Sequence, residues 1–240
     1  GALLNCAFLG ILRAQQILIA AGLAEFGKEL LIGFGLVSMG LAATFILKQM
    51  DFKRMLAYSS VEHMGILALG VGLGGGAVFG SLFHTVNHSF TKGMLFMVAG
   101  NILTVMHSKS TFKIRGLLHI MPYSSVLWLA GFLAITGSPP FGSFLSEFTI
   151  LKSAIEQGHI IIAIFYILFL SVIFIVMALI FLRMSFGKPR ISEPIAKQES
   201  WTMIVPPAVL CAIVLLLGVY MPQVLENLLN EAARQLSGAL

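Results

Sequence analysis

Seven apolar runs, each long enough to cross the hydrocarbon core of a bilayer, constrain this chain more than any other feature. A transmembrane helix needs about 20 predominantly apolar residues. Charged residues make up only 10% of the chain, against about 25% in a soluble domain, and no run alternates apolar and polar residues as barrel strands do. The sequence therefore predicts an all-α fold, a polytopic transmembrane helix bundle of about seven spans. The runs cover residues 2–20, 31–47, 55–72, 77–105, 125–151, 160–182 and 204–220.

The basic residues give the bundle a direction, because Lys and Arg concentrate in the cytoplasmic loops of membrane proteins. Every second loop is basic, and the loops between them hold few positive charges. This alternation predicts a cytoplasmic start, seven crossings and an external C-terminal tail. The basic loops contain Lys48, Lys53, Arg54, Lys109, Lys113, Arg115, Arg183, Lys188, Arg190 and Lys197, and the opposite side has Lys28, Lys152 and Arg234.

The fifth apolar run contains a break. Residues 136–142 read TGSPPFG, with two prolines and two glycines inside an apolar segment. Proline removes a backbone donor and clashes with the preceding helical turn, so we expect a discontinuous helix around Gly137–Pro140. An ordinary proline kink is the alternative. Irregular backbone at membrane depth persists only where protein or a water-filled cavity surrounds it, and Glu147 two turns later favours an ion pathway at this break.

The fourth run carries titratable residues on one helical face. His84, His88 and Lys92 recur every four positions, which on a helix makes a stripe with about 6 Å between neighbours. Charged groups at the centre of a membrane helix cost about 2.5–3.5 kcal/mol or more and so require a reason. Histidine exchanges protons near neutral pH, and the stripe therefore indicates a proton relay. A lone intramembrane histidine would more often be a hydrogen-bonding helix contact.

Further ionisable residues lie in neighbouring runs. Glu62 and His63 fall one to two turns inside the third run and either pack as buried polar groups or belong to the pathway. Glu147 lies in the second half of the broken helix, and Arg13 in the first run can extend its charge to the interface.

Motifs for resident cofactors are missing from the sequence. The two cysteines, Cys6 and Cys211, lie far apart, whereas an iron–sulfur cluster needs about four protein ligands. The glycine-rich residues 72–76 lack the strand and helix of a nucleotide fingerprint. We therefore expect no cofactor and no metal in this chain, and no nucleic-acid partner.

Four stretches together resemble a known family. They are residues 3–13 (LLNCAFLGILR), 51–65 (DFKRMLAYSSVEHMG), 84–96 (HTVNHSFTKGMLF) and 137–148 (GSPPFGSFLSEF). In their order and in their residues, these stretches resemble the proton-conducting, antiporter-like membrane subunits of respiratory complex I, of multisubunit Na⁺/H⁺ antiporters and of membrane-bound NiFe hydrogenases. The motif SSVEHMG, together with the motif HxxNHxxxK, is most similar to the hydrogenase-4 component F branch of this family.

The resemblance implies a subunit of fourteen helices built around two inverted five-helix repeats. This chain resembles helices eight to fourteen of such a subunit and so looks like a C-terminal fragment. Residues 1–20 would end the first repeat, 31–184 would form the second, and 204–220 would be the last transmembrane helix. The family's central lysine or histidine then corresponds to Lys92, with His88 beside it, and its residue on the broken helix to Glu147. Asn5 stands where the family often has lysine or histidine, which is a departure from its pattern.

The leading hypothesis is a proton-translocating subunit of a hydrogenase-linked or NADH dehydrogenase-like redox complex in a bacterial or archaeal inner membrane. Protons would pass along His84, His88 and Lys92 towards Glu147, with Glu62 and His63 as side members. The subunit would carry no redox centre, and its partners would be other membrane subunits, a peripheral redox arm and the lipid bilayer. Alternatives are a subunit of a multisubunit cation/proton antiporter, a haem-binding membrane cytochrome and a truncated scaffold that no longer conducts.

Overall fold

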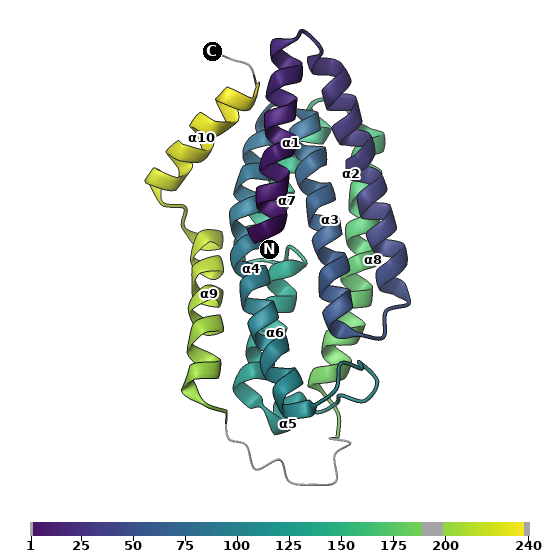
Figure 1. Cartoon of the computed structure of the whole chain (residues 1–240), viewed down its shortest axis with the longest axis vertical. Helices are drawn as coiled ribbons and strands as arrows, with labels where there is room; N and C mark the ends of the chain where they lie inside the picture. Colours follow the sequence, from purple (N-terminus) through teal and green to yellow (C-terminus); the bar gives the residue numbers. More distant parts are fainter. Residues whose placement is uncertain (1, 189–198, 238–240) are drawn as a thin grey trace.

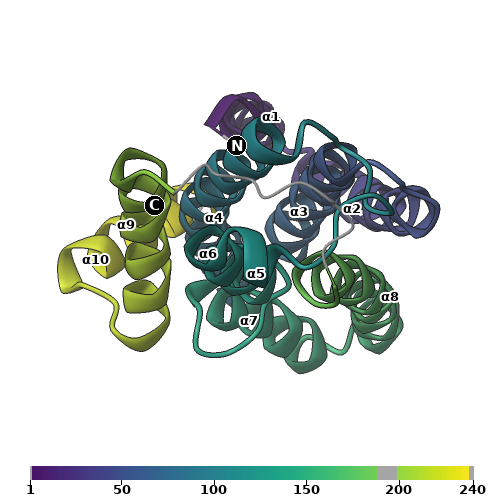
Figure 2. The same cartoon turned by 90° about the horizontal axis from the view of Figure 1, so that it is seen from below.

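The computed structural model describes residues 2–188 and 199–237, and within them every regular element is a helix. The long helices run alternately up and down, and α4 lies inside the bundle in contact with α1, α3, α6, α7, α9 and α10 (Figures 1 and 2). The helices are α1 Ala2–Ala20, α2 Ala24–Leu47, α3 Phe52–Leu73, α4 Gly76–Met106, α5 Leu117–Ile120, α6 Pro122–Ile135, α7 Gly142–Glu156, α8 Ile160–Ser185, α9 Trp201–Val219 and α10 Gln223–Ser237.

Six of the described helices, α1, α2, α3, α4, α8 and α9, are long and apolar enough to cross a membrane. The predicted fifth span consists instead of two shorter helices, α6 with 14 residues and α7 with 15. At about 1.5 Å per residue each half measures roughly 22 Å, so neither crosses a bilayer of about 30 Å alone. The chain is thus an all-α polytopic bundle in which one span is a discontinuous helix.

Two predicted boundaries differ from the structure for physical reasons. Helix α2 begins at Ala24, seven residues before the apolar run at residue 31, because the helix continues through the charged residues Glu25, Lys28 and Glu29 outside the apolar stretch. The predicted C-terminal tail contains α10, a helix with apolar residues on one face and polar residues on the other. Its buried Leu229 packs against Phe83 of α4 and Leu217 of α9.

The basic loops meet at one end of the bundle, as the charge alternation predicts. The backbone N–H of Phe52 donates to the carbonyl of Lys109 at 3.2 Å, and the N–H of Thr111 donates to the carbonyl of Met50 at 2.9 Å. The backbone N–H of Gly116 donates to the carbonyl of Phe186 at 3.3 Å. These bonds join three loops at the lower end in Figure 1. Arg190 and Lys197 lie outside the described residues.

The helices differ in how much of their surface faces outwards. In the most apolar 18-residue stretch of each helix, about 72% of the residues of α3 are buried, against 22% of those of α8. Trp128 stacks on Phe181 with 4.1 Å between ring centroids, inside the largest apolar cluster. Large apolar side chains such as Ile161 and Leu179 remain exposed on α8. The inner helices therefore can hold polar groups away from lipid, while α8 presents an apolar surface.

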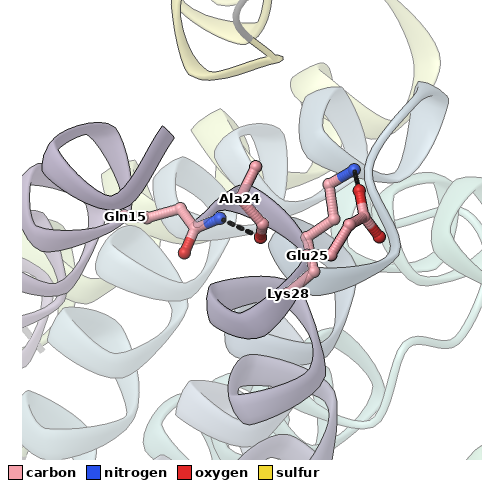
Figure 3. A network of polar contacts seen from close by, with 4 residues as sticks. All are labelled: Gln15, Ala24, Glu25 and Lys28. Carbon is pink, nitrogen blue, oxygen red and sulfur yellow. Dashed lines mark hydrogen bonds and ion pairs between the residues drawn. The ribbon is translucent and has the colours of Figure 1, made fainter. Parts of the chain in front are cut away.

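A tight turn joins α1 to α2 at the upper end of the bundle in Figure 1. Figure 3 shows the polar contacts beside it. The buried amide of Gln15 donates to the carbonyl of Ala24 at 3.4 Å, and Lys28 pairs with Glu25 at 2.7 Å on the outside. Gly27 packs so closely on Gln15 that a Cβ would overlap its amide oxygen. These contacts hold the first two helices side by side.

Helices α2 and α3 approach each other closely through two glycines. A Cβ on Gly35 would lie 2.8 Å from the Gly65 carbonyl oxygen, and a Cβ on Gly65 would lie 2.7 Å from the Gly35 carbonyl oxygen. Small residues at such crossings allow membrane helices to pack backbone against backbone. This contact sets the position of α3, which carries part of the site described below.

The α2–α3 crossing makes a first prediction. Gly35→Ala should lower the free energy of unfolding by about 1–3 kcal/mol because the added methyl forces the two backbones apart. Gly33→Ala is the matched control on the same helix, since a Cβ there meets nothing within 4 Å. Thermal unfolding of the purified full-length protein in detergent measures both, and equal midpoints for the two variants would contradict the close crossing.

Candidate functional site

Antiparallel packing of α3 and α4 brings two polar rows face to face. The row on α3 contains Ser59 and His63, four residues apart, and the row on α4 contains His84, His88 and Lys92 at the same spacing. Because the helices run in opposite directions, rising numbers on α3 meet falling numbers on α4. Lys92 therefore lies opposite Ser59, while His84 and His88 lie opposite His63.

Lys92 is completely buried, and two oxygen atoms of α3 bind its ammonium group. Its Nζ donates to the Leu56 carbonyl at 2.7 Å and to the Ser59 hydroxyl at 2.6 Å. Glu62, also buried, lies close enough to interact with the charge of Lys92. The buried amine of Lys92 thus has neutral oxygen partners for its hydrogens, and the carboxyl group of Glu62 lies in the same buried region.

Three histidines form a buried cluster beside Lys92. The ring centroid of His63 lies 5.0 Å from that of His84 and 5.0 Å from that of His88, and the centroids of His84 and His88 are 6.4 Å apart. His63 Nδ1 and His84 Nε2 are 2.8 Å apart, within hydrogen-bond distance. Neither ring nitrogen of His88 has a hydrogen-bond partner among the described residues. His63 is thus the ring that contacts both of the others.

The hydrogen-bond contacts are compatible with one set of proton positions on these rings when they are neutral. If Ser146 donates its hydroxyl hydrogen to the Ser143 carbonyl at 2.8 Å, His84 donates the 2.8 Å contact to Ser146 through Nδ1–H. In this arrangement His84 Nε2 is an acceptor, and His63 donates to it through Nδ1–H. His63 Nε2 is buried and has no side-chain hydrogen-bond partner among the described residues.

The break between α6 and α7 positions Glu147. Gly137 has a positive φ of 59°, and its missing side chain leaves room for the Glu147 carboxylate, which a Cβ would overlap. Oxygen Oε1 of Glu147 is buried and has no hydrogen-bond partner among the described residues. The carboxylate, His63 and His84 offer ligand atoms that all lie within 4.8 Å of one another. The broken helix thus brings an acid to the histidine cluster.

Glycines allow the surrounding helices to approach the break. A Cβ on Gly142 would overlap the Asn87 amide of α4, and a Cβ on Gly218 of α9 would overlap the Pro140 carbonyl. A Cβ on Gly80 of α4 would lie 2.9 Å from Ile150 of α7. The break therefore packs against α4 at Gly142 and against α9 at Gly218, while Pro139 and Pro140 remain exposed.

A cavity of about 570 Å³ lies between the break that follows α6, helix α7 and helix α8, and it reaches Glu147. Glu147, Thr136 and Gly137 contribute to its wall, together with apolar residues of α7 and α8 such as Phe148 and Phe174. Tyr166 of α8 donates to the backbone carbonyl of Glu147 at 3.4 Å. One side of Glu147 therefore faces the histidine cluster and the other a cavity.

The spatial order of the six predicted site residues differs from their order along the chain. We predicted a path through His84, His88 and Lys92 towards Glu147, with His63 at the side. The structure places His84, not Lys92, nearest the acid end, and His63 packs beside both His84 and His88. The stripe on α4 runs away from Glu147 because α7 packs on α4 near Gly80 and His84.

Sequence reasoning missed two serines that bind the titratable groups. Ser59 binds Lys92 and Ser146 binds His84, and the Ser146 hydroxyl also contacts the backbone carbonyl of Ser143. The spacing of Ser59 to His63, equal to that of the α4 stripe, was a usable signal for the first. Nothing in the sequence pairs Ser146 with a histidine 62 positions away.

Two other polar residues have local partners. Asn5 of α1 donates to the Thr85 carbonyl and the Ser89 hydroxyl of α4, and so joins α1 to the outer side of the stripe helix. Arg13 donates to Gln16 at 2.9 Å on an exposed surface. These hydrogen bonds connect neither Asn5 nor Arg13 to the histidine cluster.

These features define an integral membrane protein with a broken helix and a buried row of titratable side chains. Residues 1–174 match the family described as "NADH:quinone oxidoreductase/Mrp antiporter, TM". The chain belongs to this family, in agreement with the resemblance of its four sequence stretches.

Particular relatives agree with this assignment. The chain is 38% identical over 193 residues to the "Hydrogenase-4 component F homolog" of Methylacidiphilum infernorum, covering 79% of this chain and 40% of that protein. It is 30% identical over 245 residues to an Na⁺/H⁺ antiporter subunit of Alkalihalophilus pseudofirmus, covering 90% of this chain and 30% of the relative. The chain thus spans less than half the length of these curated relatives.

A solved structure has the same arrangement of helices. A chain of the "membrane-bound sulfane sulfur reductase (MBS), an archaeal respiratory membrane complex" superimposes with a TM-score of 0.79 at 28% identity, covering 90% of this chain and 43% of the other. The bundle is therefore an architecture also found in a subunit of a respiratory membrane complex.

The geometry at the break makes a second prediction. Gly137→Ala and Gly158→Ala both place a side chain at positive φ, with a cost of about 1–2 kcal/mol. A Cβ at Gly137 meets the Glu147 carboxylate, whereas one at Gly158 meets nothing within 4 Å. Only Gly137→Ala should change how fast a hydrophobic carbodiimide labels Glu147, read by peptide mass spectrometry. Identical labelling rates in the two variants would show that Gly137 does not position the acid.

Proposed function

We propose that this chain belongs to a proton-translocating membrane subunit of a hydrogenase-linked or NADH dehydrogenase-like redox complex. The observation that carries the proposal is the buried row Lys92, His88, His63, His84 and Glu147 inside a lipid-spanning bundle. Intramembrane ionisable groups that face one another, rather than lipid, mark ion pathways in membrane proteins. The row contains no redox group of its own, so the driving force would come from partner subunits.

The contacts within the row support stepwise proton transfer. The His63–His84 bond of 2.8 Å and the His84–Ser146 bond of 2.8 Å are short enough for a proton to move along them. Histidine can bind and release a proton near neutral pH. Where no hydrogen bond links neighbours, as around His88, a bridging water would be needed. Glu62 would adjust the charge on Lys92, as a side member of the row.

The assembly follows from the same proposal. The partners would be further membrane subunits and a peripheral redox arm, in a bacterial or archaeal inner membrane with the basic loops on the cytoplasmic side. Residues 1–20 would end a first structural repeat, residues 31–184 would form the second, and residues 204–220 the last span. The identity to a hydrogenase-4 component F homolog supports this interpretation of the branch.

The proposal makes a third prediction. Lys92→Ala, Glu147→Gln and His63→Ala in the full-length subunit should each abolish proton transport by the reconstituted complex, because each removes a group that no described neighbour replaces. Proton uptake into proteoliposomes, followed with a pH-sensitive dye during turnover, measures the effect.

The matched control is Lys152→Ala on the same helix as Glu147. Lys152 is exposed and pairs with Glu156 at 3.7 Å at the helix end, so transport should be unchanged. Blue native electrophoresis shows whether each complex assembles. Normal transport by an assembled Lys92→Ala or Glu147→Gln complex would refute the proposed pathway.

Membership of a cation/proton antiporter is the second candidate function, favoured by the identity to an Na⁺/H⁺ antiporter protein over 90% of this chain. It would use the same row without a redox arm. A fourth prediction separates the two: in vesicles that contain the assembled complex, proton flux should follow addition of electron donor and should not need Na⁺. Flux that requires an Na⁺ gradient and no electron donor would instead establish the antiporter function.

A further inference from the structure

We infer that His63, His84 and Glu147 form a binding site for a divalent transition-metal cation of the zinc class. All three side chains are buried and come from three different helices, α3, α4 and α7. Their ligand atoms lie within 4.8 Å of one another. Two imidazoles and a carboxylate are the protein ligands of many zinc sites, in which water takes the fourth position.

The geometry needs only small movements to accept the ion. Tetrahedral zinc with Zn–N bonds of about 2.05 Å places two ligating nitrogens about 3.3 Å apart. His63 Nδ1 and His84 Nε2 are 2.8 Å apart, so the rings would separate by roughly half an ångström. The metal would take the place of the hydrogen that the two nitrogens share, and that hydrogen would move to His63 Nε2, so that His63 stays a neutral imidazole ligand.

The neighbours of the cluster favour a ligating orientation. His84 donates its Nδ1–H to Ser146, which in turn donates to the Ser143 carbonyl. Ligating histidines usually donate their second N–H in this way, which fixes the ring and leaves the other nitrogen free for the metal. Oxygen Oε1 of Glu147 is buried and has no hydrogen-bond partner among the described residues. The carboxylate therefore has unsatisfied lone pairs, as a cation site requires.

The donor set selects the class of ion. Imidazole nitrogen suits Zn²⁺, Cu²⁺, Ni²⁺ and Co²⁺, whereas Na⁺, Mg²⁺ and Ca²⁺ prefer oxygen ligands. The Glu147 carboxylate and the nearby Glu62 would offset the charge of a dication in the interior. The cavity of about 570 Å³ reaches the other side of Glu147 and gives an ion an approach to the carboxylate, although neither histidine lines it.

The consequence for transport rests on the proposed function. A bound metal would occupy the His63–His84 hydrogen bond through which protons are proposed to pass. Zinc would therefore act as a reversible inhibitor at the acid end of the row. Metal binding itself can be measured without any proton transport, so the two proposals fail independently.

The test uses Co²⁺ as a spectroscopic substitute for zinc, titrated into the purified full-length protein in detergent. We expect d–d absorption of a tetrahedral site that saturates at one equivalent and disappears when Zn²⁺ is added. His84→Ala and His63→Ala should lose this absorption. Glu147→Gln, which keeps the shape of the side chain, should weaken binding at least about tenfold.

The control variant is the double substitution His119→Ala with His159→Ala, since both histidines lie outside the buried cluster and far from it in the sequence. It should bind Co²⁺ as the unmodified protein does. Size-exclusion chromatography identifies any variant that fails to fold, and Glu147→Gln then decides the test. No d–d absorption in the unmodified protein, or equal affinity in Glu147→Gln, would overturn the site.

Discussion

The packing of the broken helix against α4 is the contact on which the polar interior depends. Ser146 of α7 binds His84, and Gly80 of α4 leaves the space that lets α7 come this close. Gly137 provides the matching space for the Glu147 carboxylate. A continuous helix in place of α6 and α7 would lack the turn at residues 136–141 and would not place the acid beside Gly137. The break is therefore what joins Glu147 to the histidines.

Lipid supplies no hydrogen bonds, so every polar group in the interior must find its partner within the bundle. Lys92 meets this condition through Leu56 and Ser59, and His84 through His63 and Ser146. His88 and one oxygen of Glu147 have no such partner among the described residues. Groups of this kind cost free energy in a purely structural core. Their presence fits a pathway in which protons or water visit these atoms transiently.

The same apolar composition serves two different purposes in this chain. Only about 22% of the apolar stretch of α8 and 17% of that of α9 are buried, as expected of lipid-facing helices, and both have little polar content. Helix α3 is largely buried, and its glycine contact with α2 holds Ser59 and His63 against α4. The outer helices thus separate the polar row from the bilayer, while the inner ones position it. The metal site proposed at His63, His84 and Glu147 lies at the acid end of that row.

The sequence by itself determined the helical class, the span count, the break and the face shared by His84, His88 and Lys92, because hydropathy, proline chemistry and helical periodicity are local properties. It also indicated the family through four ordered stretches. Only the tertiary structure decided that His63 packs beside both other histidines and that Glu147 reaches His84 instead of Lys92. Those facts depend on the register between α3 and α4 and on where α7 packs, which glycines far apart in the chain establish together. The amphipathic α10 and the early start of α2 also required the structure, since neither has the long apolar run by which a span is recognised.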